Sequence, residues 1–282
     1  MSGESSTSAQ SSEPPALFGG DATAMADFYD TAMVPGLFTP WAEDLARRVP
    51  LAAGHRVLDV ACGTGALAAV LAAHLVGGGG GVLGTDFAPA MVARAEAKGI
   101  PGATFRVGDA VAQPVPDGEF DGVTCQQGLQ FIPDRLGAMR EMRRALRVGG
   151  WLAVSCWTQI SEQPPFAAFA AALAGRGWTV EAAAIGVPFS LFDPGDLVAL
   201  AEQAGFGAIR IETVTLQVVL PPARAWADGY AHVPPFVGAY TAATPHDREL
   251  FLSHVEDQLS PFATADGVAA PMTSNILTAT AP

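Results

Sequence analysis

Residues 57–65 read Val-Leu-Asp-Val-Ala-Cys-Gly-Thr-Gly. The apolar run predicts a short buried strand over 56–61, and the glycines predict a tight turn into an Ala- and Leu-rich helix over 66–75. Glycine lets the backbone approach a ligand closely, and the first turn of a helix presents unpaired N–H groups. Strand, glycine-rich turn and helix in this order therefore predict a ligand site where the helix begins.

Strand and helix patterns alternate from this stretch to Trp157, which is typical of βαβ units and a parallel sheet. The helix after the fourth strand has apolar residues at helical spacing, and Gly149-Gly150 is its expected stop. After Trp157 the alternation of strand and helix patterns is less regular. The expected further strands are 82–86, 103–107, 120–125, 151–157, 208–220 and 274–279, and the expected further helices are 89–98, 134–147, 166–174 and 193–204.

Two carboxylates follow the early strands at positions that suit a nucleoside. Asp86 ends the second strand, and there a carboxylate can accept both hydroxyls of a ribose. Asp109 follows the third strand, where it can accept a hydrogen bond from an adenine amino group or can cap a helix. Gly63-x-Gly65-x-x-Ala68 also satisfies the dinucleotide-binding fingerprint, so a nicotinamide cofactor is an open alternative.

These elements, in this order, resemble the class I S-adenosylmethionine-dependent methyltransferases, in particular the small-molecule branch with the ubiquinone and menaquinone biosynthesis enzymes. The resemblance covers about residues 55–157. Asp59 fills the acidic place of the family's glycine-rich motif, and Ala61 stands where its first glycine is usual. Gln126–Asp134 and Arg144–Gly150 resemble the family's loop after strand four and its turn before strand five.

The resemblance implies an α/β fold. Its sheet is Rossmann-like, seven-stranded and mostly parallel, with helices on both faces, the last strand antiparallel and helical lid and cap insertions. It also implies S-adenosylmethionine as cofactor and no metal. The implied cofactor residues are Tyr29, Phe38 and Trp41 in the lid, Asp59, Ala61, Gly63 and Gly65 at the turn, Asp86 at the ribose, Phe87, Met91, Asp109 and Ala110 at the adenine, and Gln126 at the sulfonium.

The chain then divides into a Ser-rich tail, a lid, a core and two caps. The tail has almost nothing apolar to bury, which predicts disorder. The expected ranges are 1–15 for the disordered tail, 21–50 for the N-terminal helical lid, 51–157 for the cofactor-binding core, 158–192 for a cap insertion and 193–282 for the rest of the core with a second helical cap at 221–266.

Both cap regions are apolar and aromatic, which favours a small hydrophobic, cyclic methyl acceptor, methylated on O, N or C by in-line displacement. The aromatic run Trp226, Tyr230, Phe236 and Tyr240 either lines the acceptor pocket or packs the cap. His232 and His246 are the general-base candidates. A protein of this fold that binds the cofactor without methylating, as a rearrangement catalyst or binding module, is an alternative, and a nicotinamide-dependent oxidoreductase is another.

The net charge argues against two classes of binding partner. The chain has 28 acidic and 15 basic residues, a net charge of −13, which argues against non-specific nucleic-acid binding and against an anionic membrane surface. It has no apolar run of transmembrane length, no secretory signal pattern and three cysteines without a disulfide framework. We therefore expect a cytoplasmic protein with a small-molecule substrate and no nucleic-acid or membrane partner, and the sequence allows a homodimer.

Overall fold

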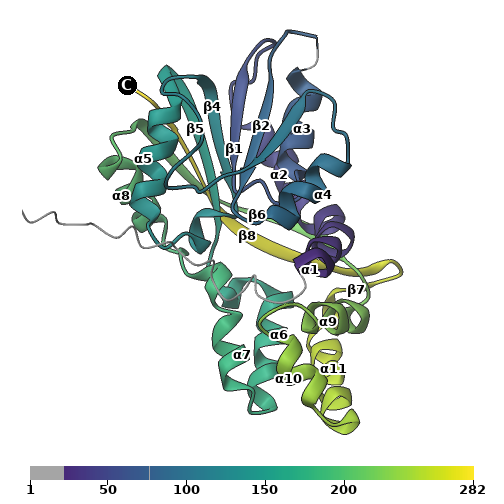
Figure 1. Ribbon diagram of the computed structural model, residues 1–282. Coiled ribbons are helices and arrows are strands. Elements are labelled where there is room, and N and C mark those ends of the chain that lie inside the picture. Colours follow the sequence, from purple (N-terminus) through teal and green to yellow (C-terminus); the bar gives the residue numbers. More distant parts are fainter. Residues whose placement is uncertain (1–21, 76) are drawn as a thin grey trace, which may run out of the picture.

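A twisted sheet forms the centre of the molecule (Figure 1). The computed structural model describes residues 22–75 and 77–282. Within them the strand order is β3-β2-β1-β4-β5-β8-β6, and a short strand, β7, pairs with β8. The strands are β1 (Arg56–Val60), β2 (Gly81–Asp86), β3 (Ala103–Val107), β4 (Phe120–Gln126), β5 (Leu146–Trp157), β6 (Gly207–Leu220), β7 (Ala263–Thr264) and β8 (Gly267–Thr280).

The strand directions confirm the predicted mostly parallel sheet with an antiparallel last strand. Strands β1 to β5 pair in parallel, and β8 lies antiparallel between β5 and β6. The two-residue β7 adds an eighth strand to the seven that were predicted. Within β1, side chains alternate between the two faces, so Val57 packs in one hydrophobic core and Leu58 in the other.

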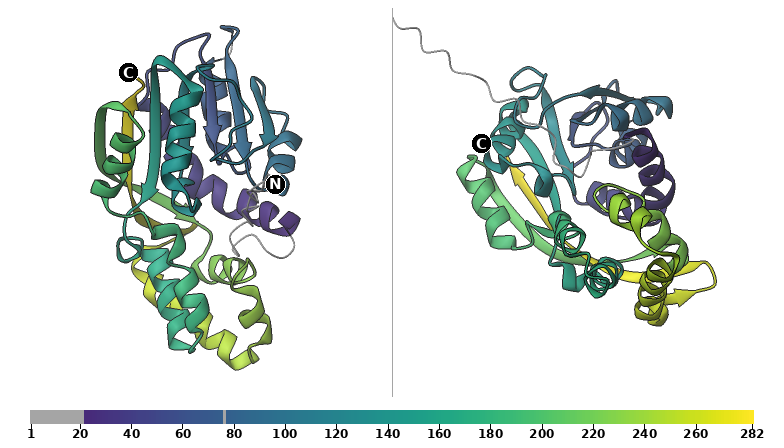
Figure 2. Two further views of the ribbon diagram at one scale, coloured as in Figure 1. Left: turned by 60° about the vertical axis from the view of Figure 1, so that its left-hand side comes forward. Right: turned by 60° about the horizontal axis from the view of Figure 1, so that its bottom comes forward.

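Helices cover both faces of the sheet, as predicted (Figures 1 and 2). On one face, α2 and α3 pack against each other, with α4 beside them over β2 and β3. On the other face, α5 and α8 pack together and bury Met139 and Leu197 against the strands. The helices are α2 (Thr39–Arg47), α3 (Ala66–Leu75), α4 (Pro89–Ala97), α5 (Arg135–Ala145) and α8 (Pro194–Gln203).

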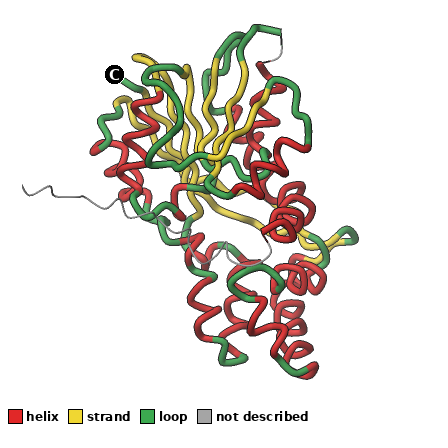
Figure 3. Tube along the Cα trace, viewed as in Figure 1, coloured by secondary structure: helices red, strands yellow, loops and turns green. Residues whose placement is uncertain are grey.

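A lobe of helices lies beyond one end of the sheet, below most of the yellow strands in Figure 3. Its core centres on Phe169, which meets Tyr230, Phe236 and Phe251 with ring centroids 5.1 to 5.3 Å apart. The two 14-residue strands β6 and β8 run on from the sheet toward this lobe. The lobe consists of α6 (Pro164–Gly175), α7 (Thr179–Ala184), α9 (Ala223–Ala231), α10 (Val237–Ala242) and α11 (Pro245–Leu259).

The N-terminal lid, predicted as helical over 21–50, is one continuous helical run through Pro35 and Pro40. It comprises α1 (Ala22–Phe28), the π-helical segment η2 (Tyr29–Phe38) and α2. Pro35 lies inside η2, and Pro40 lies in the first turn of α2. The predicted disordered tail, residues 1–15, lies outside the described residues.

Several element boundaries differ from the prediction, most of all around Gly149-Gly150 and at the last strand. The helix over 134–147 ends at Ala145, because Leu146 is extended, buried and already paired with Phe120. Gly149-Gly150 therefore lies inside β5 and does not stop a helix. The last strand is also far longer than 274–279, because β6 pairs with it from end to end.

Short 3-10 segments complete the chain: η3 (Leu129–Phe131), η4 (Ile160–Glu162), η5 (Val187–Phe189) and η6 (Ser260–Phe262). Among the described residues, none of the helices alone has the length and apolar character to cross a membrane. One pair, Thr179–Phe189 and Pro194–Gln203, meets that test only jointly and is bent by 56°.

Candidate functional site

A cavity opens at the carboxyl ends of the parallel strands, beside β1. There the chain order reverses, since β2 and β3 lie on one side of β1 and β4 and β5 on the other. Ligands bind at such switch points in open α/β sheets. Ten of the predicted cofactor residues line the cavity: Tyr29, Phe38, Ala61, Gly63, Asp86, Phe87, Met91, Asp109, Ala110 and Gln126. Trp41, Asp59 and Gly65 do not line it.

The glycine-rich turn after β1 has the backbone that its sequence predicts. Gly63 and Gly65 have φ values of +54° and +85°, which glycine adopts without strain. Ala61, in the place of the usual first glycine, has φ +55° and so accepts a left-handed conformation that costs an L-residue about 1–2 kcal/mol. A Cβ on Gly65 would stand 2.9 Å from the Phe105 ring, which explains a glycine at that position.

Asp86 is held at the tip of β2 by two backbone donors. Its Oδ2 accepts from the Gly63 N–H at 2.8 Å and its Oδ1 from the Ala88 N–H at 2.9 Å. Burial raises the pKa of this carboxyl, and both hydrogen bonds oppose that rise. Each oxygen keeps lone-pair capacity for a further donor from the cavity. Asp109 also lines the cavity, and its Oδ1 accepts from the Val111 N–H at 3.0 Å within a turn.

Asp59 lies beneath the turn, 1% exposed, and not on the cavity wall. Its Oδ1 accepts from the Thr124 hydroxyl at 2.8 Å, and its Oδ2 is buried without a hydrogen-bond partner. Burial raises the pKa of Asp59 to about 7, helped by the charge of Asp86 and opposed by the Thr124 hydrogen bond. This carboxyl therefore titrates near neutral pH.

The lid forms one wall of the cavity with stacked aromatic rings. Tyr29 stacks on Phe38 with centroids 4.7 Å apart, and Tyr29 lies directly against Gly63. Trp41 is fully buried and meets Trp157 edge-on at 5.4 Å. Because Trp157 lines the cavity and Trp41 does not, Trp41 supports the wall from behind.

Gln126, at the end of β4, joins the strand ends to the lid. Its Nε2 donates to the Phe38 carbonyl at 3.0 Å, and its Oε1 is buried without a partner. The next residue, Gln127, has φ +52° and also lines the cavity. Its side chain donates to the Ser274 hydroxyl at 2.9 Å on β8. The loop after β4 is thus fixed from both sides, and the strained residue turns the chain around the cavity.

The helical lobe and the neighbouring segment η5 add further aromatic side chains to the cavity lining. Phe166, Phe189 and Tyr230 line the cavity. Of the aromatic run in the second cap, only Tyr230 does so, because Trp226, Phe236 and Tyr240 are buried in the lobe. Of the four aromatic residues, Tyr230 therefore lines the cavity and the other three pack the lobe.

The two predicted base candidates lie elsewhere. His232 is exposed, with Nδ1 2.7 Å from the Asp228 carbonyl, and His246 is exposed near the start of α11. Neither lines the cavity.

Asp30 is a residue that the sequence prediction missed. Its carboxylate accepts hydrogen bonds from Thr64 in the glycine-rich turn, from Arg94 on α4 and from Lys98 directly after α4. The only sequence signal was its place next to Tyr29, because its partners lie 34 to 68 residues away along the chain.

Comparisons with known proteins agree with this geometry. A family profile described as "Methyltransferase domain" matches residues 58–154. A demethylmenaquinone methyltransferase of Geobacillus kaustophilus is 39% identical over 114 residues, which is 39% of this chain and 48% of that protein. The chain thus spans about half the length of this curated relative. The demethylmenaquinone methyltransferase of Staphylococcus carnosus is 31% identical over 193 residues, 62% of this chain and 77% of that protein.

The fold is shared with solved methyltransferases. Phosphoethanolamine N-methyltransferase 2 of Haemonchus contortus, in complex with S-adenosylmethionine, has a TM-score of 0.60 at 18% identity and covers 94% of this chain and 59% of its own. The sequence match to the Staphylococcus carnosus enzyme extends well beyond the glycine-rich turn. The chain therefore belongs to the class I S-adenosylmethionine-dependent methyltransferases, as its resemblance to the menaquinone biosynthesis branch predicted.

Proposed function

We propose that this chain transfers a methyl group from S-adenosylmethionine to O, N or C of a small hydrophobic, cyclic acceptor. One observation carries the proposal. A single cavity has a glycine-rich turn and two carboxylates on one wall, and aromatic side chains from the lid and lobe on the other. The first wall suits a charged nucleoside cofactor, and the second suits an apolar acceptor.

The residues of the first wall fit this cofactor. Gln126 lines the cavity with an Oε1 that is buried without a hydrogen-bond partner, and the missing side chain of Gly63 leaves open space beside Tyr29. Asp86 would take the ribose, and Phe87, 40% exposed at the cavity, would contact the adenine. When bound, S-adenosylmethionine supplies an electrophilic methyl group on a sulfonium centre.

The second wall supports an uncharged acceptor. Phe166, Phe189 and Trp157 line it, and in the described part of the chain no Lys, Arg or His does. A phosphorylated or carboxylated acceptor would lack a cation there. The relatives are named for demethylmenaquinone, so a quinone-type ring is the first acceptor to test.

The chain's own part in the reaction is binding, orientation and exclusion of water. An in-line displacement on a sulfonium needs alignment of the nucleophile with the bond that breaks, and little covalent help. Tyr29 and Phe38 cover the turn, and Tyr230 faces the cavity from the lobe. Burial raises the pKa of both tyrosine hydroxyls, so at neutral pH they are hydrogen-bond donors for an acceptor oxygen.

Calorimetric titration with S-adenosylmethionine, S-adenosylhomocysteine and NADH in parallel tests the cofactor. We expect micromolar binding of the first two and none of NADH. In the dinucleotide-binding fold the sixth strand follows the fifth in the sheet, whereas here the antiparallel β8 lies between β5 and β6. Binding of NADH alone would overturn the proposal.

An acceptor screen with quinols and phenols tests the transfer, with release of S-adenosylhomocysteine as the readout. Product formation supports methylation. If the chain instead binds the cofactor and converts the acceptor without consuming S-adenosylmethionine, it is a rearrangement catalyst.

We also propose a cytoplasmic location, which the three free, buried thiols Cys62, Cys125 and Cys156 support. A homodimer stays a prediction, for which light scattering of the purified chain is the test.

A further inference from the structure

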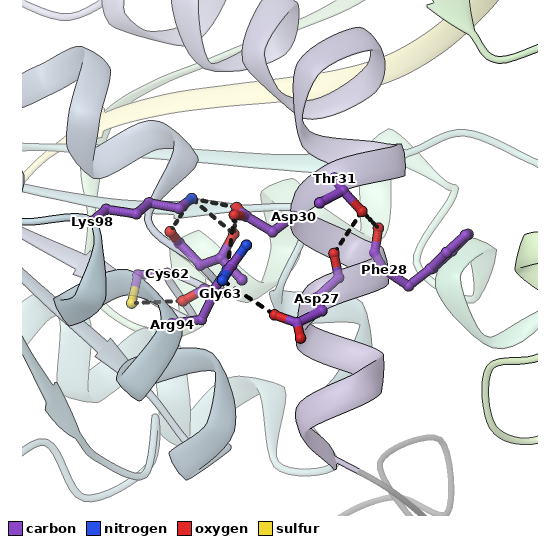
Figure 4. A network of polar contacts seen from close by, with 9 residues as sticks. Asp27, Phe28, Asp30, Thr31, Cys62, Gly63, Arg94 and Lys98 are labelled. Carbon is purple, nitrogen blue, oxygen red and sulfur yellow. Dashed lines mark hydrogen bonds and ion pairs between the residues drawn. The ribbon is translucent and has the colours of Figure 1, made fainter.

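The Asp30 carboxylate lies at the centre of a polar network between the lid and the core (Figure 4). Its side chain is only 11% exposed. Oδ1 accepts from the Thr64 hydroxyl at 2.8 Å and pairs with Lys98, and Oδ2 accepts from Arg94 Nε at 3.1 Å. Burial favours the neutral acid, but the hydrogen bonds from Lys98, Thr64 and Arg94 outweigh it, so the pKa of Asp30 lies below its usual value.

The partners of Asp30 belong to the two elements that form the cofactor wall. Thr64 lies between the glycines of the turn, and Lys98 also donates to the Thr64 carbonyl at 2.7 Å. Arg94 and Lys98 lie at the far end of α4, whose first turn carries Met91 to the cavity. One lid carboxylate therefore joins the glycine-rich turn and α4.

The neighbour of Asp30 in the chain is Tyr29, whose ring lies against Gly63. The other end of the π-helical segment is fixed as well, because the Phe38 carbonyl accepts from Gln126. Between these two points the backbone at Gly36 touches β6, since a Cβ there would stand 1.6 Å from the Val219 carbonyl oxygen. The Tyr29 end is thus the part of the lid whose position depends on side-chain hydrogen bonds to the turn.

We propose that Asp30 is a positioning residue that holds Tyr29 against the glycine-rich turn and so couples docking of the lid to cofactor binding. The part of this inference that concerns cofactor binding rests on the proposed function. The coupling runs through Thr64, because any ligand that orders the turn also orders the hydroxyl that Asp30 needs. By thermodynamic reciprocity, a lid that is docked by Asp30 must in turn raise the affinity of the turn for its ligand.

Asp27 provides a matched control on the same helix. It also pairs with Arg94, at 3.2 Å, but its side chain is 54% exposed and no described contact joins it to the turn. Exposed ion pairs contribute little, whereas a recessed carboxylate with several donors contributes more. Asp30→Asn and Asp27→Asn therefore remove the same charge from the same segment with different expected consequences.

The test uses the full chain, with hydrogen–deuterium exchange over residues 22–38 and calorimetry with S-adenosylhomocysteine. For Asp30→Asn we expect faster exchange of that segment in the free protein and an affinity about tenfold weaker, within the usual range of coupling between sites. Asp27→Asn should leave both within about twofold. Lys98→Met should also speed exchange of the segment and weaken the affinity. In the double variant, each of these effects should be smaller than the sum of the two single-variant effects.

Hydrogen–deuterium exchange of peptides from β1 and β4 reports whether each variant is folded. If Asp30→Asn does not fold, Lys98→Met is measured in its place. An unchanged lid in Asp30→Asn would overturn the positioning role. A loosened lid with wild-type affinity would overturn the coupling. If the unmodified chain does not bind S-adenosylhomocysteine, the proposed function fails and the coupling with it, while exchange in the free protein still decides whether Asp30 positions the lid.

Discussion

The Tyr29 ring lies 3.6 Å from the point that a Cβ on Gly63 would occupy. A methyl group there would meet the ring at ordinary contact distance and fill the space between the lid and the turn. We therefore expect Gly63→Ala to weaken S-adenosylhomocysteine binding about tenfold or more in calorimetry, as 1.4 kcal/mol of lost contact would.

Gly79→Ala is the control for this change. Gly79 also has a positive φ, +76°, but no atom lies within 4 Å of its would-be Cβ. It should lose a similar stability, about 1–2 kcal/mol, and keep its affinity. Equal affinity losses in both variants would show that backbone strain, and not the space beside Tyr29, decides binding.

Asp86→Ala should weaken S-adenosylmethionine binding by about 1–3 kcal/mol, the usual loss for a buried polar contact left unmade. Asp193 offers a matched control. It accepts a backbone N–H, that of Gly195 at 2.7 Å, but it does so at the start of α8 and off the cavity. Asp193→Ala should cost about 1 kcal/mol of stability as a lost helix cap and leave calorimetric affinity unchanged. An Asp86→Ala variant with wild-type affinity would remove Asp86 from the ribose site.

Asp59 makes the stability of the free protein depend on pH. Its pKa rises from 3.8 to about 7 on folding, so between these values the folded chain holds a proton that the unfolded chain has lost. The unfolding free energy therefore falls as pH rises through this window, by up to about 4 kcal/mol. Denaturant unfolding at a series of pH values from 4 to 8 measures this fall in the unfolding free energy.

Asp59→Asn should flatten this pH dependence, with the smaller slope from Asp86 left in place because the pKa of Asp86 is raised in the same direction. The variant should match the wild type near pH 4 and exceed it above pH 7. An equally steep profile in the variant would assign the slope to other groups.

The side of the cavity with the glycine-rich turn and the two carboxylates was predictable because its constraints are local. A buried strand that ends in a glycine turn fixes Ala61 and Gly63 relative to each other, and parallel neighbours bring Asp86 and Asp109 to the same edge of the sheet. Asp59 and Trp41 were assigned to the same site and lie one layer behind the wall. Spacing along the chain identified their neighbourhood, but it does not say which side chain faces the cavity.

The aromatic wall of the cavity was not predictable in the same way, because packing between distant segments decides which side chains line it. Trp226 and Tyr230 lie one turn apart on α9 and stack with centroids 5.6 Å apart, yet only Tyr230 lines the cavity. The length of β8 has the same origin, because its first half pairs with the distant segments β6 and β7 and not with β5. Asp30 is the clearest case, because its role depends on Thr64 and Lys98, which no sequence pattern connects to it.

His232→Ala and His246→Ala should each keep the wild-type rate within about twofold from pH 6 to pH 9, because neither side chain lines the cavity. A pH–rate profile with the acceptor found in the screen measures this. Loss of rate together with loss of the acidic limb of the profile in either variant would make that histidine the base and would require the lobe to move.

Ala61→Gly tests the strain that this chain accepts at the first position of its turn. Ala61 has φ +55°, and relief of this strain should exceed the entropy that glycine adds to the unfolded chain. We expect the unfolding free energy to rise by about 0.5–1 kcal/mol in denaturant titrations. Ala208, with φ +47° in β6 and off the cavity, is the matched site, and Ala208→Gly should gain a similar amount. A loss of stability at Ala61 alone would show that contact of its methyl group with the loop at Gly128 outweighs the backbone strain.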